Sequence, residues 1–117
     1  KLIDKNIAVK IHGDGLQTRD FTYVDDVSRA IKKACLVNGN EGMIFNVGTG
    51  VESNIQDIVK NFEKIYNKKI KIEYTENRDI DNVRRRLMNI ESIRINLNWI
   101  PKTLFYDGLI KTINWYT

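Results

Sequence analysis

Short strand-like and helix-like stretches alternate along this chain, and the strand-like stretches are few. Apolar residues alternate, or run together briefly, at 7–11, 21–24, 43–47 and 70–74, which predicts strands. Apolar residues three and four positions apart predict helices that begin near positions 25, 53, 89 and 103. About four short strands are too few for a doubly wound sheet of their own. The pattern therefore predicts an α+β fold, either a small mixed domain of about four helices and about four short strands or part of a larger α/β protein.

Polar residues at the start of each helical stretch predict how the helices are capped. Asp25, Asn89 and Thr103 each precede an apolar-periodic segment, as N-cap residues do. Ser53 and Gln56 fit the S-x-x-Q capping box. These four starts are typical of separate short helices rather than one long one.

The last twenty residues predict a helix stop and a part of the core. Asn98 follows an apolar-periodic stretch and precedes Pro101, so we expect it to end a helix in the left-handed conformation. Trp99 and Trp115 lie among Leu and Ile residues at helical spacing, and we expect both indoles to be buried.

Length and composition favour one soluble domain over residues 1–117. The 117 residues are 42% hydrophobic and 29% charged, and no apolar run approaches the ~20 residues that span a bilayer. Cys35 is the single cysteine, which excludes an internal disulfide and fits a reducing cytoplasm. The chain opens at Lys1 rather than at Met, so we expect it to be a piece of a longer protein.

The charge balance favours anionic partners without identifying them. The formal net charge is +4, which suits nucleic acid, an anionic membrane or a phosphorylated small molecule. The positive charge is dispersed except at Arg84–Arg86, and alternating side chains prevent three consecutive strand residues from facing one way. A basic module that binds RNA or another anion is therefore an alternative, ranked second because a one-sided stripe is lacking.

Residues 13–26, GDGLQTRDFTYVDD, form the first motif that can carry chemistry. A tight glycine turn is followed by one arginine, Arg19, at the start of a strand-like stretch. An arginine beside such a loop is placed to fork onto a phosphate. Its spacing to Asp20 and Asp25 also allows a surface ion pair, which the spacing alone favours.

Three further motifs follow in order. FNVGTG at 45–50 lacks the third glycine of the G-x-G-x-x-G fingerprint, so a strand-to-helix turn is the better interpretation than a dinucleotide loop. RDIDNVRRR at 78–86 is basic, and LNWIP at 97–101 opens an ending that includes DGL at 107–109 and TINWY at 112–116.

Together these motifs resemble those of the extended short-chain dehydrogenases/reductases. The first is similar to G-D-G-x-Q-x-R-D-F-x-Y-V-x-D, and the others to F-N-V-G-x-G, R-P-x-D-x-R-R and L-G-W-x-P. That family includes UDP-sugar 4-epimerases, dTDP-glucose 4,6-dehydratases and UDP-glucuronate decarboxylases. The likeness spans nearly the whole chain, and it implies the C-terminal substrate-binding portion of an extended, Rossmann-type protein.

The resemblance implies a nucleotide-sugar site. Arg19 and Arg78 would contact the diphosphate of a UDP- or dTDP-sugar, and Asn46 would lie at the same site. The chain has Asp79 in place of the family's Pro and one extra residue before the next helix. Either Asp81 or Asn82 would therefore contact the nucleotide ribose or base.

The resemblance also implies what this chain does not supply. It contains neither the Y-x-x-x-K pair nor a G-x-x-G-x-x-G loop, so we expect no catalytic and no cofactor-binding residues here, and NAD only in the full-length parent. One histidine and one cysteine cannot build a metal site. The expected partners are the missing N-terminal Rossmann domain and, in the parent, a second subunit of a homodimer, with neither membrane nor nucleic acid. The fragment would bind substrate without turning it over, as part of a UDP-sugar 4-epimerase-like enzyme.

Overall fold

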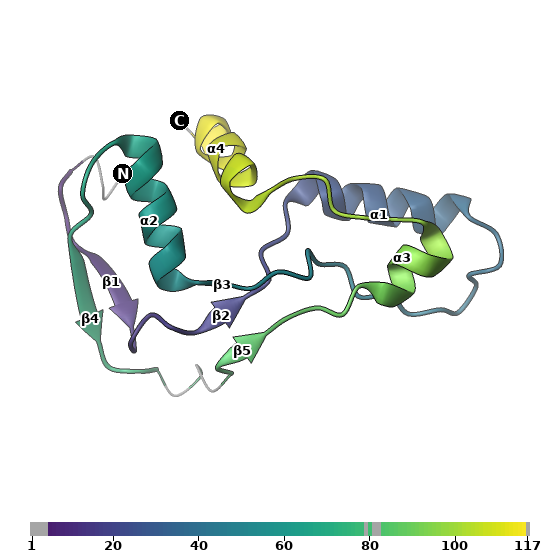
Figure 1. Cartoon of the computed structure of the whole chain (residues 1–117), viewed down its shortest axis with the longest axis horizontal. Coiled ribbons are helices and arrows are strands. Elements are labelled where there is room, and N and C mark those ends of the chain that lie inside the picture. Colours follow the sequence, from purple (N-terminus) through teal and green to yellow (C-terminus); the bar gives the residue numbers. More distant parts are fainter. Residues whose placement is uncertain (1–4, 79, 81–82, 117) are drawn as a thin grey trace. The chain divides into compact units, whose positions relative to one another are not determined.

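The structure, a computed structural model, describes residues 5–78, 80 and 83–116 (Figure 1). Contacts group the chain into two compact units, which are described separately. The first unit comprises Lys1–Arg19 and Ser53–Arg86, and the second comprises Asp20–Glu52 and Leu87–Thr117. Within the described residues there are four helices and five strands, three of which have only two residues, so the expected small mixed fold is confirmed.

A parallel strand pair and one helix make up most of the first unit. Strand β1 (Val9–His12) pairs in parallel with β4 (Ile72–Thr75), which confirms two of the predicted strands with small shifts in their bounds. Helix α2 (Ile55–Tyr66) belongs to the same unit. Ile11, on β1, is 4% exposed. Parallel strands end at the same edge, so the loops that follow β1 and β4 leave the pair together.

Helix α2 begins one residue later than the capping box predicts. Asn54 is the N-cap, and its side chain accepts a hydrogen bond of 2.8 Å from the Asp57 backbone N–H. Ser53 instead lies in the short strand β3 (Ser53–Asn54), and Gln56 donates to the Asp14 carbonyl. The capping-box prediction is therefore wrong by one residue: Asn54, the last residue of β3, caps the helix, and the Gln56 side chain is bonded to the Asp14 carbonyl instead of to the cap.

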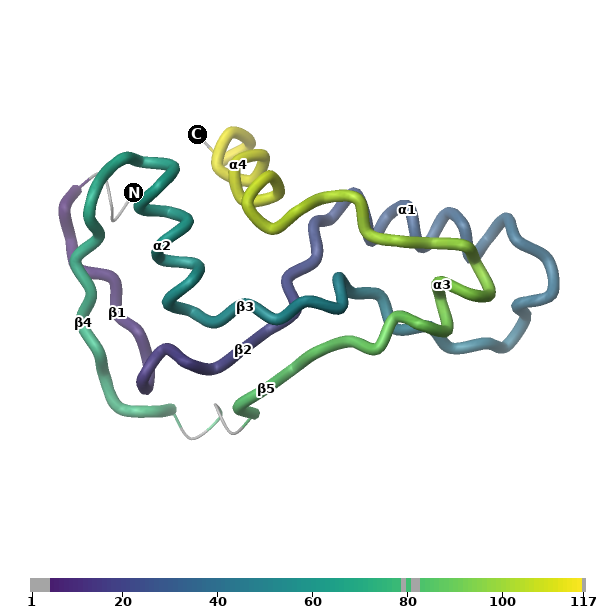
Figure 2. Tube along the Cα trace, in the orientation of Figure 1, coloured from purple at the N-terminus to yellow at the C-terminus, as the bar shows by residue number. Residues whose placement is uncertain are grey.

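A second, three-stranded sheet in the first unit has the order β3-β2-β5. Strand β2 (Thr18–Arg19) lies in the centre, antiparallel to β3 and parallel to β5 (Arg85–Arg86). Figure 2 shows the three traces running beside one another. Two-residue strands carry no periodicity, so the sequence pattern does not predict them.

Three helices form the second unit: α1 (Val24–Leu36), α3 (Glu91–Leu97) and α4 (Phe105–Tyr116). Its core is a small cluster around Trp99, which is fully buried, and it holds Ala30, Ile93 and Leu97. Lys33, on α1, donates to the Leu97 carbonyl at the end of α3, which ties the two helices together. Figure 1 shows α1 and α3 side by side.

Two predicted strands of the second unit are wrong. Helix α1 begins at Val24, and neither 21–23 nor 43–47 forms a ladder within the described part of the chain. An apolar run becomes a strand only where a neighbour takes its backbone N–H and C=O groups. Phe45 and Val47 pack against the Trp99 core instead, while Ile44 between them is 90% exposed.

Asp26, not Asp25, is the acidic residue that organises the start of α1. The N-cap is Tyr23, with no side-chain cap, so the prediction for Asp25 is wrong. Asp26 is 1% exposed. Its carboxylate pairs with Arg29 and accepts hydrogen bonds from the backbone N–H groups of Lys102 and Thr103 at 3.0 and 2.9 Å. These contacts join α1 to the segment that precedes α4.

The remaining cap predictions have mixed outcomes. Asn89 lies just before the N-cap position of α3, yet its side chain accepts from the Glu91 N–H, the first of the helix. Asn98 ends α3 in the left-handed conformation, as predicted. Helix α4 begins at Phe105, so Thr103 lies one residue too early to cap it.

The two tryptophans have opposite environments. Trp99 is fully buried, as expected, and its indole N–H donates to the Asp26 carbonyl. Trp115 is 84% exposed, so the expectation of burial is wrong for this residue. Helical spacing gives the face of a helix but not whether another element covers it.

We predict that Asp26→Asn destabilises the second unit by about 3 kcal/mol, because a buried acceptor of several hydrogen bonds loses its charge and one acceptor oxygen. Urea denaturation followed by the fluorescence of buried Trp99 measures the change. Asp25→Asn, at an exposed position of the same helix turn, is the matched control and should shift the midpoint little. Equal shifts for both variants would contradict the role of Asp26.

The same carboxylate makes stability depend on pH. Burial alone would raise the pKa of Asp26, but the hydrogen bonds from Arg29 and from the Thr103 and Lys102 N–H groups outweigh it and lower the pKa below its usual value. The stabilisation is therefore complete above the unfolded pKa of about 3.9 and is lost as pH falls through the folded one. We expect the Trp99-monitored unfolding free energy to decline below about pH 5. The decline should be shallower in Asp26→Asn, and identical slopes would rule this carboxylate out as the cause.

Candidate functional site

The two arginines predicted to contact a diphosphate both lie in the first unit. Arg19 is half-buried in β2, the central strand of its sheet, and its Nη1 donates to the Thr18 carbonyl at 2.7 Å. This bond uses one of the five guanidinium N–H donors. Arg78 is exposed and follows β4 by three residues.

A glycine loop borders both arginine-bearing segments. Gly13 and Gly15 have φ of 75° and 72°, a backbone region that favours glycine. The Gly13 N–H donates to the Thr75 carbonyl at 2.9 Å, and a Cβ on Gly13 would collide with the Asn77 side chain. The chain that leads to Arg78 therefore leaves β4 against the same loop that leads to Arg19.

An exposed bidentate ion pair fixes the tip of this loop. Arg84 donates from both terminal nitrogens to Asp14, at 2.9 and 2.8 Å. The pKa of Asp14 is lowered, mainly by the hydrogen bond from Arg84 and then by the one from the Leu16 N–H. The hydrogen bond to Asp14 in turn raises the pKa of Arg84. The Thr18 N–H also donates to the Arg84 carbonyl at 3.0 Å. Arg84 thus positions the loop and is engaged by protein, unlike a member of a continuous basic stripe.

The other predicted site residues are placed differently. Asp81 and Asn82 lie outside the described residues. Asn46 belongs to the second unit, where it is exposed and its side chain donates to the Asn89 carbonyl at 3.4 Å. The structure thus places the segment that leads to Arg78 against the loop that precedes Arg19, while the roles of Arg19, Arg78 and Asn46 remain predictions.

The second glycine loop, at 48–50, is closed by a carboxylate of its own unit. The Thr49 and Gly50 N–H groups donate to Asp20 at 2.8 and 2.9 Å. A Cβ on Gly48 would lie 2.6 Å from the Asp20 Oδ2. The N–H groups that a dinucleotide phosphate would need are already used, so these residues do not fit NAD. This role of Asp20 was not predicted, because nothing in the sequence motif indicates its partner.

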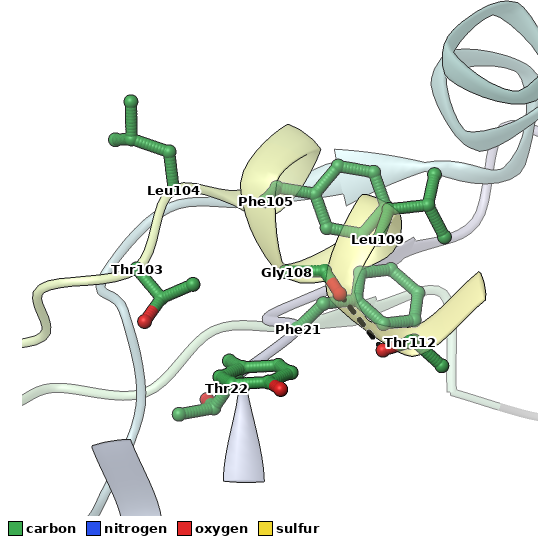
Figure 3. Close-up of a pocket in the computed structure, with 9 residues that line it drawn as sticks. Phe21, Thr22, Thr103, Leu104, Phe105, Gly108, Leu109 and Thr112 are labelled. Atoms are coloured by element: carbon green, nitrogen blue, oxygen red, sulfur yellow. Dashed lines mark hydrogen bonds between the residues drawn. The ribbon is translucent and has the colours of Figure 1, made fainter. Parts of the chain in front are cut away.

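A pocket of about 200 Å³ in the second unit is lined by uncharged residues, unlike the arginine-bearing segments of the first unit (Figure 3). Aromatic and aliphatic side chains from 21–23 and from the start of α4 line it, and none of its lining residues is charged. Phe21 and Phe105 contact each other there with ring centroids 5.4 Å apart. Such a pocket lacks the cationic donors that a diphosphate requires.

The described residues offer neither a metal site nor a membrane-spanning helix. In that part of the chain no three His, Cys, Asp or Glu side chains are grouped so as to hold a metal ion. None of the described helices is long and apolar enough to cross a membrane.

Comparisons with known proteins agree on one family. The family model described as GDP-mannose 4,6 dehydratase matches residues 3–112. A UDP-glucuronate 4-epimerase from Thermodesulfobacterium geofontis is 36% identical over 98% of this chain and 35% of its own length. A human dTDP-D-glucose 4,6-dehydratase is 33% identical over 98% of this chain and 34% of its own length.

Solved structures show the same likeness. A Bacillus cereus UDP-glucuronic acid 4-epimerase, in complex with UDP-glucuronic acid and NAD, matches with a TM-score of 0.90 and 28% identity. The match covers 99% of this chain and 38% of that one. A Thermotoga maritima UDP-glucose 4-epimerase with UDP-glucose gives a TM-score of 0.88 and 30% identity, covering 98% and 36%.

The chain therefore belongs to the NAD-dependent epimerase/dehydratase family of extended short-chain dehydrogenases/reductases. It matches about a third of the length of these epimerases and of the human dehydratase. It also matches 16% of a trifunctional UDP-glucose 4,6-dehydratase, epimerase and reductase from Arabidopsis thaliana, at 33% identity.

We predict that Asp20→Asn destabilises the second unit by about 2 kcal/mol, because the amide cannot accept with both of its atoms from the N–H groups of the 48–50 loop. Urea denaturation monitored by Trp99 fluorescence reports the change. Asp107→Asn, at an exposed position in α4, removes the same charge as a control. A loss no larger than the control's would show that Asp20 does not hold this loop.

Proposed function

We propose that this chain supplies the nucleotide-sugar-binding portion of an NAD-dependent sugar-nucleotide epimerase or dehydratase. The observation that carries the proposal is that the segment leading to Arg78 contacts the Gly13–Gly15 loop, which precedes Arg19 in the chain. Two guanidinium groups on segments that meet at one loop would suit an anion with two linked phosphates. The names of the relatives, which include UDP- and dTDP-sugar enzymes, support the same ligand class.

The contribution of these residues is binding and orientation. Arg19 and Arg78 would neutralise the diphosphate and hold the sugar in one position, with Asp81 or Asn82 contacting the ribose or base and Asn46 lying at the same site. NAD, held by another part of the whole protein, would supply the redox chemistry on the sugar. Among the possible reactions we favour UDP-sugar 4-epimerisation, supported by the UDP-sugar epimerases among the relatives and structures.

The isolated chain should bind weakly. Each well-formed charge-assisted hydrogen bond contributes ~1.5–3 kcal/mol, whereas association costs ~4–15 kcal/mol in lost freedom. Two arginines therefore give a dissociation constant of about 1 mM or weaker. A site formed by this chain alone lacks the opposite wall that ligand clefts between domains provide.

The second unit carries exposed apolar side chains that support a further partner. Ile44, Leu104 and Trp115 are 90%, 73% and 84% exposed. A contiguous apolar surface left in water marks a place that another part of a protein can cover. We propose that the N-terminal Rossmann portion of the parent covers them. The parent would be a homodimer in the cytoplasm, and the exposed free thiol of Cys35 is compatible with that reducing compartment.

We expect UDP to bind the 117-residue chain with millimolar affinity. Arg19→Gln and Arg78→Gln should each weaken UDP binding roughly tenfold, because each substitution removes a charged donor to phosphate. Chemical-shift titration by NMR measures such affinities. Arg94→Gln, exposed on α3 in the second unit, removes the same charge as a control. Equal weakening by all three variants would mean that only net charge attracts UDP.

The parent protein provides the second arm of this test. It should convert a UDP- or dTDP-sugar, whereas the chain alone should convert none. Inactivity of the parent towards every nucleotide sugar would contradict the proposal. Tight, salt-dependent oligonucleotide binding by the chain would favour the RNA-binding alternative.

A further inference from the structure

We propose that Arg86 is a further anion-binding residue and forms, with Arg19, a two-arginine subsite on one face of the β3-β2-β5 sheet. This subsite would bind the oxygens of a diphosphate. That the diphosphate belongs to a nucleotide sugar rests on the proposed function. The family resemblance does not assign a role to Arg86.

Strand register is the first observation. Strand β5 pairs with β2 in parallel, with Thr18 opposite Arg85 and Arg19 opposite Arg86. Residues in register on neighbouring strands share one face of a sheet, and such strands lie about 4.8 Å apart. Arg19 and Arg86 therefore stand side by side, and Arg85, the preceding residue of β5, belongs to the opposite face.

The other edge of the sheet extends the same face. Strand β3 pairs with β2 so that Ser53 lies opposite Arg19. The face thus carries a hydroxyl, a half-buried guanidinium and an exposed guanidinium in adjacent register positions. Each of these groups can donate to a phosphate oxygen.

Charge gives the second argument. Like charges directly opposite each other destabilise a sheet, and the β2–β5 pairing places two arginines in that relation. The neighbouring Arg84 does not add to this charge, because its guanidinium is engaged by Asp14. A dianion held between Arg19 and Arg86 removes the repulsion and accepts planar, bidentate hydrogen bonds from both.

The chain offers an unusually close control for this proposal. Arg85 and Arg86 are consecutive, both exposed and both in β5, but register assigns them to opposite faces. Replacing either by Gln removes the same charge from nearly the same place. A difference between the two variants therefore reports which face binds the anion rather than how much charge the chain carries.

The test is an NMR titration of the 117-residue chain with inorganic pyrophosphate and, separately, with UDP. We expect Arg86→Gln to weaken both roughly tenfold, Arg85→Gln to weaken them less than twofold, and Arg86→Lys to recover part of the loss. Spectra without ligand establish that each variant keeps the fold of the first unit.

Equal effects of Arg85→Gln and Arg86→Gln would overturn the subsite, as would an unchanged affinity in Arg86→Gln. If Arg19→Gln weakens UDP while Arg86→Gln does not, the subsite fails and the proposed function stands. If the unmodified chain binds neither pyrophosphate nor UDP at ligand concentrations of roughly 10 mM, tenfold above the expected dissociation constant, both the subsite and the proposed function fail.

Discussion

Backbone pairing of Thr18 and Arg19 with strands on both sides is the interaction on which the candidate site depends. Arg19 lies in the central strand of the β3-β2-β5 sheet, so its main chain is held from two directions. The same pairing draws the 84–86 segment against β2, and Arg84 then reaches Asp14 at the tip of the preceding loop. Without these few ladder contacts the arginines would belong to separate, unrelated loops.

The arginines of this chain have different roles in the structure. Arg84 closes a loop through Asp14, and Arg29 satisfies buried Asp26. Arg19, Arg78 and Arg86 remain on segments next to one glycine loop or on one sheet face. A net charge of +4 is thus a poor guide to function by itself, because part of it stabilises the fold. The fold shows a structural role for Arg84 and Arg29, and the proposed ligand contacts concern Arg19, Arg78 and Arg86.

The sequence predicted the elements whose signal is local and long enough to repeat. Helix α2 and the left-handed Asn98 follow from periodicity and from the chemistry of helix ends. The strands β2, β3 and β5 have two residues each, so only tertiary pairing defines them. The stretch 43–47 has the composition of a strand yet lacks a partner in the described residues, and Trp115 lacks a covering element.

Site prediction had the same limit. The resemblance to a family pointed to Arg19 and Arg78, and the structure shows the segment that leads to Arg78 in contact with the loop that precedes Arg19. No local pattern indicated that Asp20 closes the other glycine loop or that Arg86 registers with Arg19. Those contacts and strand pairings join residues far apart in the sequence, so a local sequence motif does not predict them.

A crystal of the chain soaked with UDP tests the central claim most directly. We expect difference density for two linked phosphates within hydrogen-bond distance of the Arg19 guanidinium, with Arg78 contacting the same diphosphate. Ordered UDP bound elsewhere, with Arg19 making no contact to it, would contradict the account.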